Sequence, residues 1–402
     1  MDDHSGTSPA RPDDSVDRSV PPLTARRESA ERVLGQLGRR LIFGEGPSLG
    51  PFDPEELGDL VGAASGQRVR GLLAGGVSAG VLALAGDQVD EVAHAHRDAM
   101  AISLVLEQML CRLHGWLSDA GIDHVVLKGP AIAHTAYEDP SLREFGDLDL
   151  LVPSEQIDRA LAMLLRRGAS RAMGELAPGW DRHFAKSITM SDRSGYEIDL
   201  HRTIAPGVFG LRIDPAELFA RTQGFMVGGR QMRALPPDAQ LLQACVHTAA
   251  GNRRVWLSSV CDIAQLAASG KVNLERFHSM ATRWRLAAVV ERATEVVRER
   301  LDGTDVSALT DGLRITEADR RHLSRYGGGF PGPAITGFAA LPLGQWVPYA
   351  RALAWPSRQN LTDRGLTRRS HLRRLANHVT VSQPRRSRRP GGSRVDHLRP
   401  AT

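Results

Sequence analysis

Apolar residues recur at helical spacing over most of this chain. Residues 89–121 predict one long helix, because apolar positions return every three or four residues and Gly121 ends the pattern. Shorter helical patterns precede this segment. Four more follow between residues 236 and 301, and another covers residues 316–326. The chain is therefore predicted to be largely helical.

The pattern changes between residues 122 and 235, where short apolar runs alternate with helical patterns. A strand, a helix, a second strand and a second helix come first, and two hairpin patterns follow them. This order predicts an α+β fold, in which a small mixed β-sheet with helices is embedded in a largely helical chain. The strands are expected at 123–129, 147–152, 170–173, 184–190 and 196–202, with a second hairpin over 224–235.

These patterns divide the chain into five expected segments. The first of them is rich in Pro, Ser and Asp, a composition typical of disorder. We expect a disordered N-terminal segment (1–28), an N-terminal helical region (29–121), an α/β core (122–235), a C-terminal helical region (236–330), and a Gly- and Pro-rich loop with a basic, disordered tail (331–402).

Charge is distributed unevenly along the 402 residues, whose net charge is +5. Residues 351–402 hold thirteen Arg and two Asp, so this tail carries +11 and the remainder carries −6. Contact of the tail with RNA, DNA or an anionic lipid surface is one interpretation, and a solvated disordered segment is the other. The tail lacks interleaved aromatic residues, which argues against a specific nucleic-acid module.

The spacing of the cysteines and the N-terminal sequence indicate the cellular compartment of the protein. Cys111, Cys245 and Cys261 lie in apolar helical patterns without CxxC spacing, which is typical of reduced thiols. The N-terminus is acidic and lacks the apolar core of a signal peptide. The longest apolar run, 71–86, contains five glycines and is too short to span a membrane. We therefore expect a cytoplasmic protein without a membrane span.

Two predicted strands carry carboxylates at alternate positions. Asp147 and Asp149 share one face of their strand, and Glu197, Asp199 and His201 share one face of a later strand. If the two strands are neighbours, three aspartates converge. Such a cluster requires a cation, and oxygen ligands favour Mg²⁺ or Mn²⁺. The alternative is an edge strand with a solvated polar face.

The sequence LKGP joins the first strand of this region to a helix. Gly129 allows close approach of the backbone to a ligand, and free amides at the helix start favour a phosphate. Lys128 adds a positive charge, and Arg143 either does the same or holds the carboxylates. Pro130 removes one amide donor. Ordinary surface charge is the alternative interpretation of Lys128 and Arg143.

This combination resembles the DNA polymerase β-type nucleotidyltransferase superfamily. More narrowly, VVLKGPAIAHTAYEDPSLREFGDLDLLVP and the later IDLHRTI resemble the bacterial family of uncharacterised nucleotidyltransferases, over roughly residues 50–300. The resemblance implies a metal-dependent enzyme that moves a nucleoside monophosphate from an NTP to an acceptor hydroxyl and releases pyrophosphate. The acceptor is open: a small molecule, a peptide, a protein or RNA.

The resemblance also implies roles for individual residues. Asp147 and Asp149 would bind metal, Asp199 would be the third carboxylate, which often takes the proton of the nucleophile, and Gly129 would lie against the triphosphate. The superfamily usually has Gly-Gly or Gly-Ser where this chain has Gly129-Pro130, and the gap from Gly129 to Asp147 is longer than in compact members. The predicted site is therefore catalytic and metal-binding at Asp147, Asp149 and Asp199, and nucleotide-binding at Lys128, Gly129 and Arg143.

Four histidines are not expected to bind metal or to act in catalysis. His201 is expected to be a hydrogen-bonded structural residue rather than a metal ligand. His247 and Asp262, in helices similar to the helical part of the family, are expected to pair and brace the body. The HAH sequence at 94–96 is a poor metal site, because residues i and i+2 of a helix do not share a face.

Two other functions compete with the enzyme. One is a catalytically degenerate protein that binds a nucleotide or a partner as an accessory of a biosynthetic pathway. Retention of all three aspartates argues against this alternative, and Pro130 favours it. The other is a nucleic-acid-binding protein that acts through its basic tail.

Overall fold

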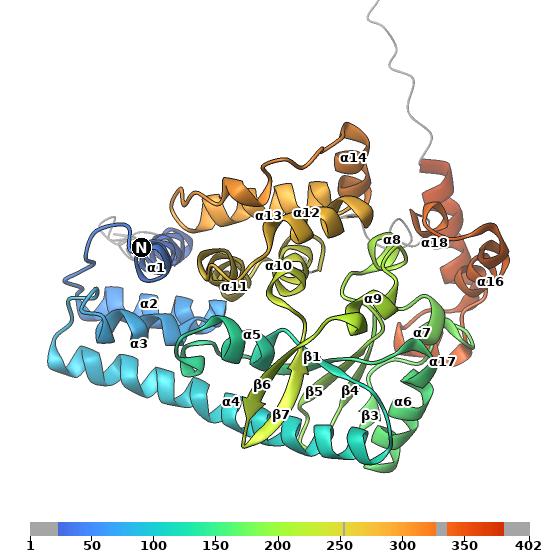
Figure 1. Ribbon diagram of the computed structural model, residues 1–402, viewed down its shortest axis with the longest axis horizontal. Helices are drawn as coiled ribbons and strands as arrows, with labels where there is room; N and C mark the ends of the chain where they lie inside the picture. The colour runs from blue at the N-terminus through green and yellow to red at the C-terminus, as the bar shows by residue number, and fades with distance from the viewer. Residues whose placement is uncertain (1–22, 252–253, 327–335, 382–402) are drawn as a thin grey trace, which may run out of the picture.

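The computed structural model describes residues 23–251, 254–326 and 336–381 (Figure 1). A seven-stranded mixed sheet lies at its centre, in the order β3-β4-β5-β2-β1-β7-β6. The predicted α+β class is confirmed, including both hairpins, β4–β5 and β6–β7. The strands are β1 (Val125–Leu127), β2 (Asp147–Leu151), β3 (Ser170–Arg171), β4 (Ser187–Ser191), β5 (Glu197–His201), β6 (Gln223–Val227) and β7 (Arg230–Ala234).

The register of the central strands brings the polar residues together. Strands β2 and β5 are parallel, with Asp149 opposite Asp199. Strand β1 is antiparallel to β2, with Leu127 opposite Asp149. Lys128, which follows Leu127, therefore leaves the sheet beside the aspartates.

One face of the sheet is a hydrophobic core. Helices α4 (Gly86–Asp119) and α6 (Ile157–Arg166) cover it, and α4 runs along the lower edge in Figure 1. The strand residues between the carboxylates point into this layer and are fully buried. Burying one such side chain stabilises the fold by about 1.5–3 kcal/mol, and this determines which residues of each strand face the core. They are Leu148, Leu150, Ile198 and Leu200.

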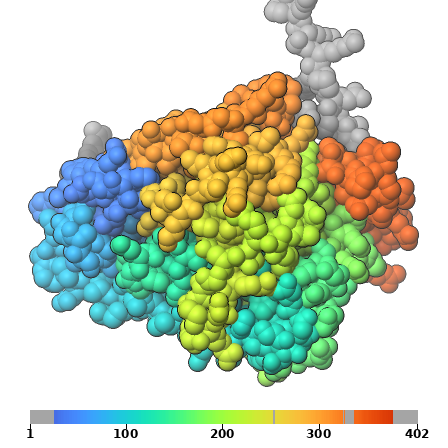
Figure 2. Space-filling view, in the orientation of Figure 1, coloured from blue at the N-terminus to red at the C-terminus, as the bar shows by residue number. Residues whose placement is uncertain are grey.

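The carboxylate face is covered by helices from both ends of the chain. Helices α10 (Pro237–Val246), α11 (Leu257–Ala268) and α13 (Ala287–Arg300) share one core with α1 (Leu23–Phe43), α2 (Pro54–Gln67) and α3 (Arg70–Ser78). Figure 2 shows the blue N-terminal helices and the orange helices as neighbours in one continuous surface. The site is thus enclosed by segments that are distant in sequence.

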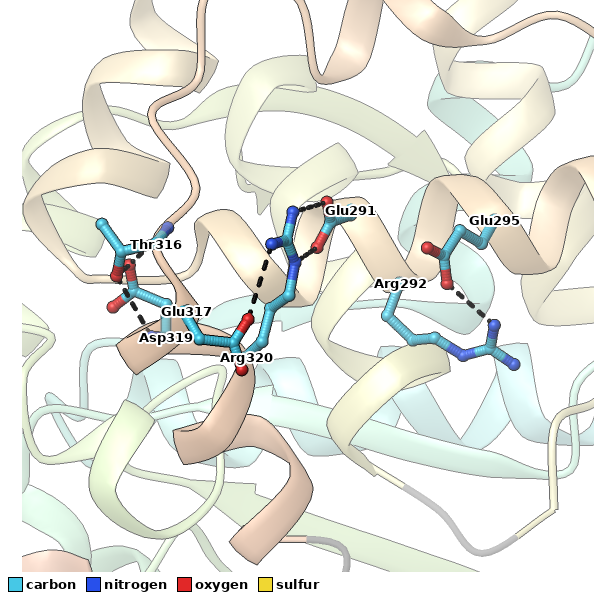
Figure 3. A network of polar contacts seen from close by, with 7 residues as sticks. All are labelled: Glu291, Arg292, Glu295, Thr316, Glu317, Asp319 and Arg320. Atoms are coloured by element: carbon cyan, nitrogen blue, oxygen red, sulfur yellow. Dashed lines mark hydrogen bonds and ion pairs between the residues drawn. The ribbon is translucent and has the colours of Figure 1, made fainter. Parts of the chain in front are cut away.

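Shorter helices complete the fold. Helix α14 docks on α13 through Arg320, whose guanidinium donates to both carboxylate oxygens of Glu291 at 2.7 and 2.6 Å (Figure 3). The remaining helices are α5 (Gly129–Ala136), α7 (Trp180–His183), α8 (Gly207–Gly210), α9 (Pro215–Ala220), α12 (Leu274–Arg283), α14 (Glu317–Tyr326), α16 (Leu343–Ala354), α17 (Arg358–Asp363) and α18 (Arg368–Val381). Among the described residues, no helix combines the length and apolar character needed to cross a membrane.

Two expectations of disorder were wrong in part. Helix α1 begins at Leu23, so residues 23–28 are helical. Helices α16–α18 occupy much of the segment expected to be loop and tail, because apolar residues among the arginines have a partner surface. Tyr349 of α16 stacks on Trp180 with ring centroids 5.1 Å apart. Residues 1–22, 327–335 and 382–402, where the other predictions of disorder fall, lie outside the described residues.

Candidate active site

Three aspartates from two parallel strands define the site. Asp147 and Asp149 of β2 and Asp199 of β5 lie on the face opposite the apolar core, as their alternation with leucine and isoleucine requires. Asp149 is only 2% exposed, whereas the side chain of Asp199 is 14% exposed. The cluster therefore runs from the protein interior toward a cavity.

Two cationic or donor groups engage Asp149. Lys128 Nζ lies 2.8 Å from Asp149 Oδ1, and His201 Nε2 lies 2.6 Å from the same oxygen. Burial raises the pKa of Asp149, but the charge of Lys128 and the hydrogen bond from His201 outweigh this effect and hold the pKa well below its usual range. Asp149 is therefore ionised at neutral pH.

His201 has a structural position in the site. Its side chain is fully buried, and its two ring nitrogens face Asp149 Oδ1 and, at 3.2 Å, the carbonyl oxygen of Thr203. Because a carboxylate is an acceptor, Nε2 donates to Asp149. A donating nitrogen is not a metal ligand, which agrees with the expected structural role.

The other two aspartates have fewer partners. Thr189 donates to Asp199 Oδ1 at 2.6 Å. The carboxylate of Asp147 accepts no hydrogen bond from any residue that the structure describes. Burial and the neighbouring Asp149 raise the pKa of Asp147. The charges of Lys128 and Arg68 offset this effect only in part, so ionised Asp147 is less favourable than an ordinary carboxylate.

The carboxylates of Asp149 and Asp199 lie close enough together to fit a divalent cation, and Asp147 lies outside this close group of described residues. Ligand atoms of Asp149, Asp199 and His201 lie within 4.8 Å of one another. His201 is already engaged, but Asp149 Oδ2, Asp199 Oδ2 and both oxygens of Asp147 have no hydrogen-bond donor among the described residues. Free carboxylate oxygens on one sheet face are the donor set that Mg²⁺ and Mn²⁺ prefer.

Lys128 and Gly129 connect the sheet to α5 beside this cluster. Lys128 has a φ of +44°, a conformation that residues with a Cβ rarely adopt. Such conformations concentrate at functional sites. The turn directs the ammonium group at Asp149 and places Gly129 at the start of α5, with Pro130 next in the first turn.

All six predicted site residues line one cavity of about 230 Å³. Its walls come from α2, the β1–α5 turn, the two central strands, α10 and α11. The lining residues are Arg68, Lys128, Gly129, Ile132, Arg143, Phe145, Asp147, Asp149, Lys186, Glu197, Asp199, Ala244, His247, Trp256, Ser258, Ser259 and Asp262.

Arg143 joins the sheet region to α11. Its guanidinium donates two hydrogen bonds to Asp262, both 2.7 Å long, and Tyr137 donates a third to the same carboxylate at 3.1 Å. The expected pairing of Asp262 with His247 is therefore wrong. Asp262 pairs with Arg143 instead, because the guanidinium is charged and can donate to both carboxylate oxygens. Burial and the nearby Lys128 and Lys186 lower the pKa of His247 to about 3, so its ring is neutral at pH 7.

Comparison with known families decides the kind of protein. The model of a family described as uncharacterised nucleotidyltransferases matches residues 53–302, more than half of the chain. The chain belongs to this family. It is an enzyme of the nucleotidyltransferase type, as its motifs predicted, and the family match covers the sheet and most of the helices around the cavity.

Two solved structures are similar to this nucleotidyltransferase. One is the antibiotic-resistance factor ANT(2'')-Ia, with a TM-score of 0.34 and 16% identity, covering 47% of this chain and 96% of that one. The other is an antigenic nucleotidyltransferase-like protein from Paracoccidioides brasiliensis, with a TM-score of 0.30 and 14% identity, covering 53% of this chain and 97% of that one. A search of curated proteins finds no match.

Several cavity residues of the nucleotidyltransferase escaped the sequence analysis. Arg68 comes from the end of α2, Lys186 from the segment before β4, and Ser258 and Ser259 from α11. Lysine scarcity was the one available signal, because Lys128 and Lys186 are two of only three lysines in the chain.

Proposed function

We propose that this nucleotidyltransferase moves a nucleoside monophosphate from an NTP to an acceptor hydroxyl and releases pyrophosphate. The observation that carries the proposal is the cluster of Asp147, Asp149 and Asp199, whose free oxygens line a cavity beside Lys128. Carboxylate oxygens without hydrogen-bond donors, next to a lysine, suit a cation together with a polyphosphate.

Each residue has a proposed role. Asp147, Asp149 and Asp199 hold Mg²⁺ or Mn²⁺, and a bound cation would neutralise charge on the phosphates during transfer. Asp199 accepts the proton of the acceptor hydroxyl at Oδ2, because Thr189 occupies Oδ1. Lys128 and Gly129 hold the phosphates of the nucleotide, and Lys128 is already within reach of the cluster.

Arg143 is assigned a positioning role in place of the expected phosphate contact. Its guanidinium donates to both carboxylate oxygens of Asp262 and to the carbonyl oxygen of Glu144. It therefore fixes α11 against the β2 region. The acceptor class remains a small molecule, a peptide, a protein or RNA. A cytoplasmic location rests on the three free thiols.

The test is metal-dependent turnover. We expect one of ATP, GTP, CTP or UTP, with Mg²⁺ or Mn²⁺, to raise the melting temperature and to release pyrophosphate. Asp149→Asn is expected to lower the rate by about a thousandfold, since a principal ligand is lost. Asp158→Asn, an exposed aspartate of α6, is the matched control.

Three results are distinguishable. Pyrophosphate release that depends on Asp149 supports the transferase. Nucleotide binding without release, in the presence of cell extract as a source of acceptor, supports the degenerate accessory protein. Neither binding nor release with any nucleotide and metal contradicts the proposed function.

A further inference from the structure

The N-terminus of α11 faces the cavity opposite the aspartates. This helix has twelve residues, and its first turn presents Ser258 and Ser259 to the cavity wall. The two serines are only 5% and 6% exposed. A helix N-terminus carries partial positive charge and free amide donors, which favour an anion.

The donors at this helix start lack protein acceptors. Neither serine hydroxyl has a hydrogen-bond partner in the described part of the chain, and the amide of Ser258 has none there either. The neighbouring amides are satisfied, that of Leu257 by Gln67 Oε1 at 2.9 Å and that of Ser259 by the carbonyl oxygen of Trp256 at 3.1 Å. Donors that line a cavity without a protein acceptor are available to a ligand.

Lys186 supplies a positive charge to the same cavity. Lys128 forms an ion pair with Asp149, and Arg143 forms one with Asp262, but Lys186 forms none with any described residue. Burial and the nearby Lys128 lower the pKa of Lys186, and the charges of the aspartate cluster offset this effect only in part. Its half-buried ammonium group therefore faces the cavity without a direct ion-pair partner among the described residues, and it is available to an anionic ligand.

We infer that Ser258, Ser259, the start of α11 and Lys186 form a binding subsite for an oxyanion, a phosphate group by preference. The two hydroxyls and the Ser258 amide donate to its oxygens, and Lys186 balances its charge. The role of this subsite in catalysis rests on the proposed function. The anion is then either the terminal phosphate of the NTP or an anionic group of the acceptor.

The test measures binding of inorganic phosphate to the full-length protein by isothermal titration calorimetry in the presence of chelator. We expect saturable binding to the unaltered protein. Ser258→Ala/Ser259→Ala and, separately, Lys186→Gln are each expected to weaken it by at least about tenfold. Thr294→Ala, which removes a buried and unpartnered hydroxyl outside the cavity, and Lys271→Gln, which alters an exposed lysine, are the matched controls. Melting temperatures verify that each variant is folded.

A second titration separates the two sources of the anion. A non-hydrolysable NTP analogue with Mg²⁺ loses affinity in the same variants if the subsite holds the terminal phosphate. If the subsite holds the acceptor, the analogue keeps its affinity and phosphate binds beside it. Asp149→Asn keeps phosphate binding in either case, so the inference can stand if the proposed function fails. Absence of phosphate binding, or binding unchanged in both the serine and the lysine variants, would overturn it.

Discussion

Asp147 and Asp149 are two residues apart on one strand, yet their surroundings drive their pKa values in opposite directions. Lys128 and His201 stabilise the ionised form of Asp149, whereas burial and the charge of Asp149 disfavour ionised Asp147. The protein thus pairs Asp149 directly with basic groups, whereas Lys128 and Arg68 stabilise ionised Asp147 only in part. Asp147 therefore lowers the stability of the ligand-free protein, and its carboxylate becomes favourable when a cation binds.

Asp147→Asn is expected to stabilise the metal-free protein at pH 7. The folded pKa of Asp147 lies above its unfolded value of about 3.9, so the ionised group destabilises the fold at neutral pH and ceases to do so below about pH 3.9. The gain in unfolding free energy should therefore shrink as the pH falls. Urea denaturation with chelator from pH 8 to pH 4 measures it.

The same variant should lose Mg²⁺-dependent thermal stabilisation, which the unaltered protein is expected to show. A lower unfolding free energy than that of the unaltered protein at pH 7 would contradict this account of Asp147. Asp158→Asn, at an exposed position, serves as the reference for a simple change of charge.

The alternation of side chains along each strand made the position of the aspartates on one sheet face predictable from sequence. Leu148, Leu150, Ile198 and Leu200 fix which face is buried, and the aspartates follow from that. Arg68 and Lys186 were missed because each lies at the end of an element or in a loop, where no period indicates a neighbour. The Arg143–Asp262 pair joins residues 119 positions apart, which local pattern does not encode.

At the scale of elements, helix α3 packs against residues 142–144 and so fixes the position of Arg143. The backbone amide and the guanidinium of Arg70 both bind the buried carboxylate of Glu144. At Gly71, an added Cβ atom would lie 2.2 Å from the carbonyl oxygen of Leu142. Glycine is therefore required for α3 to approach this close.

Gly71→Ala is expected to lower the unfolding free energy by about 1–3 kcal/mol, because backbone atoms must separate. Activity should fall with it, since the displaced segment carries Arg143. Gly58→Ala is the matched control, because a Cβ at this exposed helical position meets nothing within 4 Å. It should be neutral or stabilising by up to about 1 kcal/mol. Equal effects of the two substitutions in chemical denaturation would refute the packing argument.

Element prediction succeeded where an amphipathic pattern was long and failed where charge dominated composition. The long helix over 89–121 is present as α4, and the four helices after residue 236 are present. Helices α16 and α17 were missed because the basic composition of the whole segment indicated a disordered tail, although apolar residues such as Tyr349 and Leu353 pack in a core. Tertiary contact with Trp180 stabilises what composition alone does not indicate.

For the whole molecule, one buried ion pair connects the sheet region with the helical layer. Arg143 and Asp262 have side chains only 10% and 5% exposed. Removing one partner of such a pair leaves an uncompensated buried charge. This contact therefore contributes to the mutual position of the carboxylate cluster and α11.

Asp262→Ala is expected to lower the unfolding free energy by about 3–5 kcal/mol, because Arg143 is left unpaired. The double substitution Arg143→Met/Asp262→Leu should cost less than the single one, since no charge remains buried. Urea denaturation of both variants measures the difference. A double variant that is less stable than Asp262→Ala would show that the pair contributes mainly through direct attraction.

The one-to-one pairing of β2 with β5 also limits how this chain can change in length during evolution. Deleting a single residue inside 197–201 would turn Asp199 into the apolar layer beside α4, because side chains alternate between faces. Segments such as 172–179 lie outside the central ladder, so their length does not alter its parity. We therefore expect insertions and deletions among relatives to accumulate in such loops, and lineages that alter β5 by one residue to lose the enzyme.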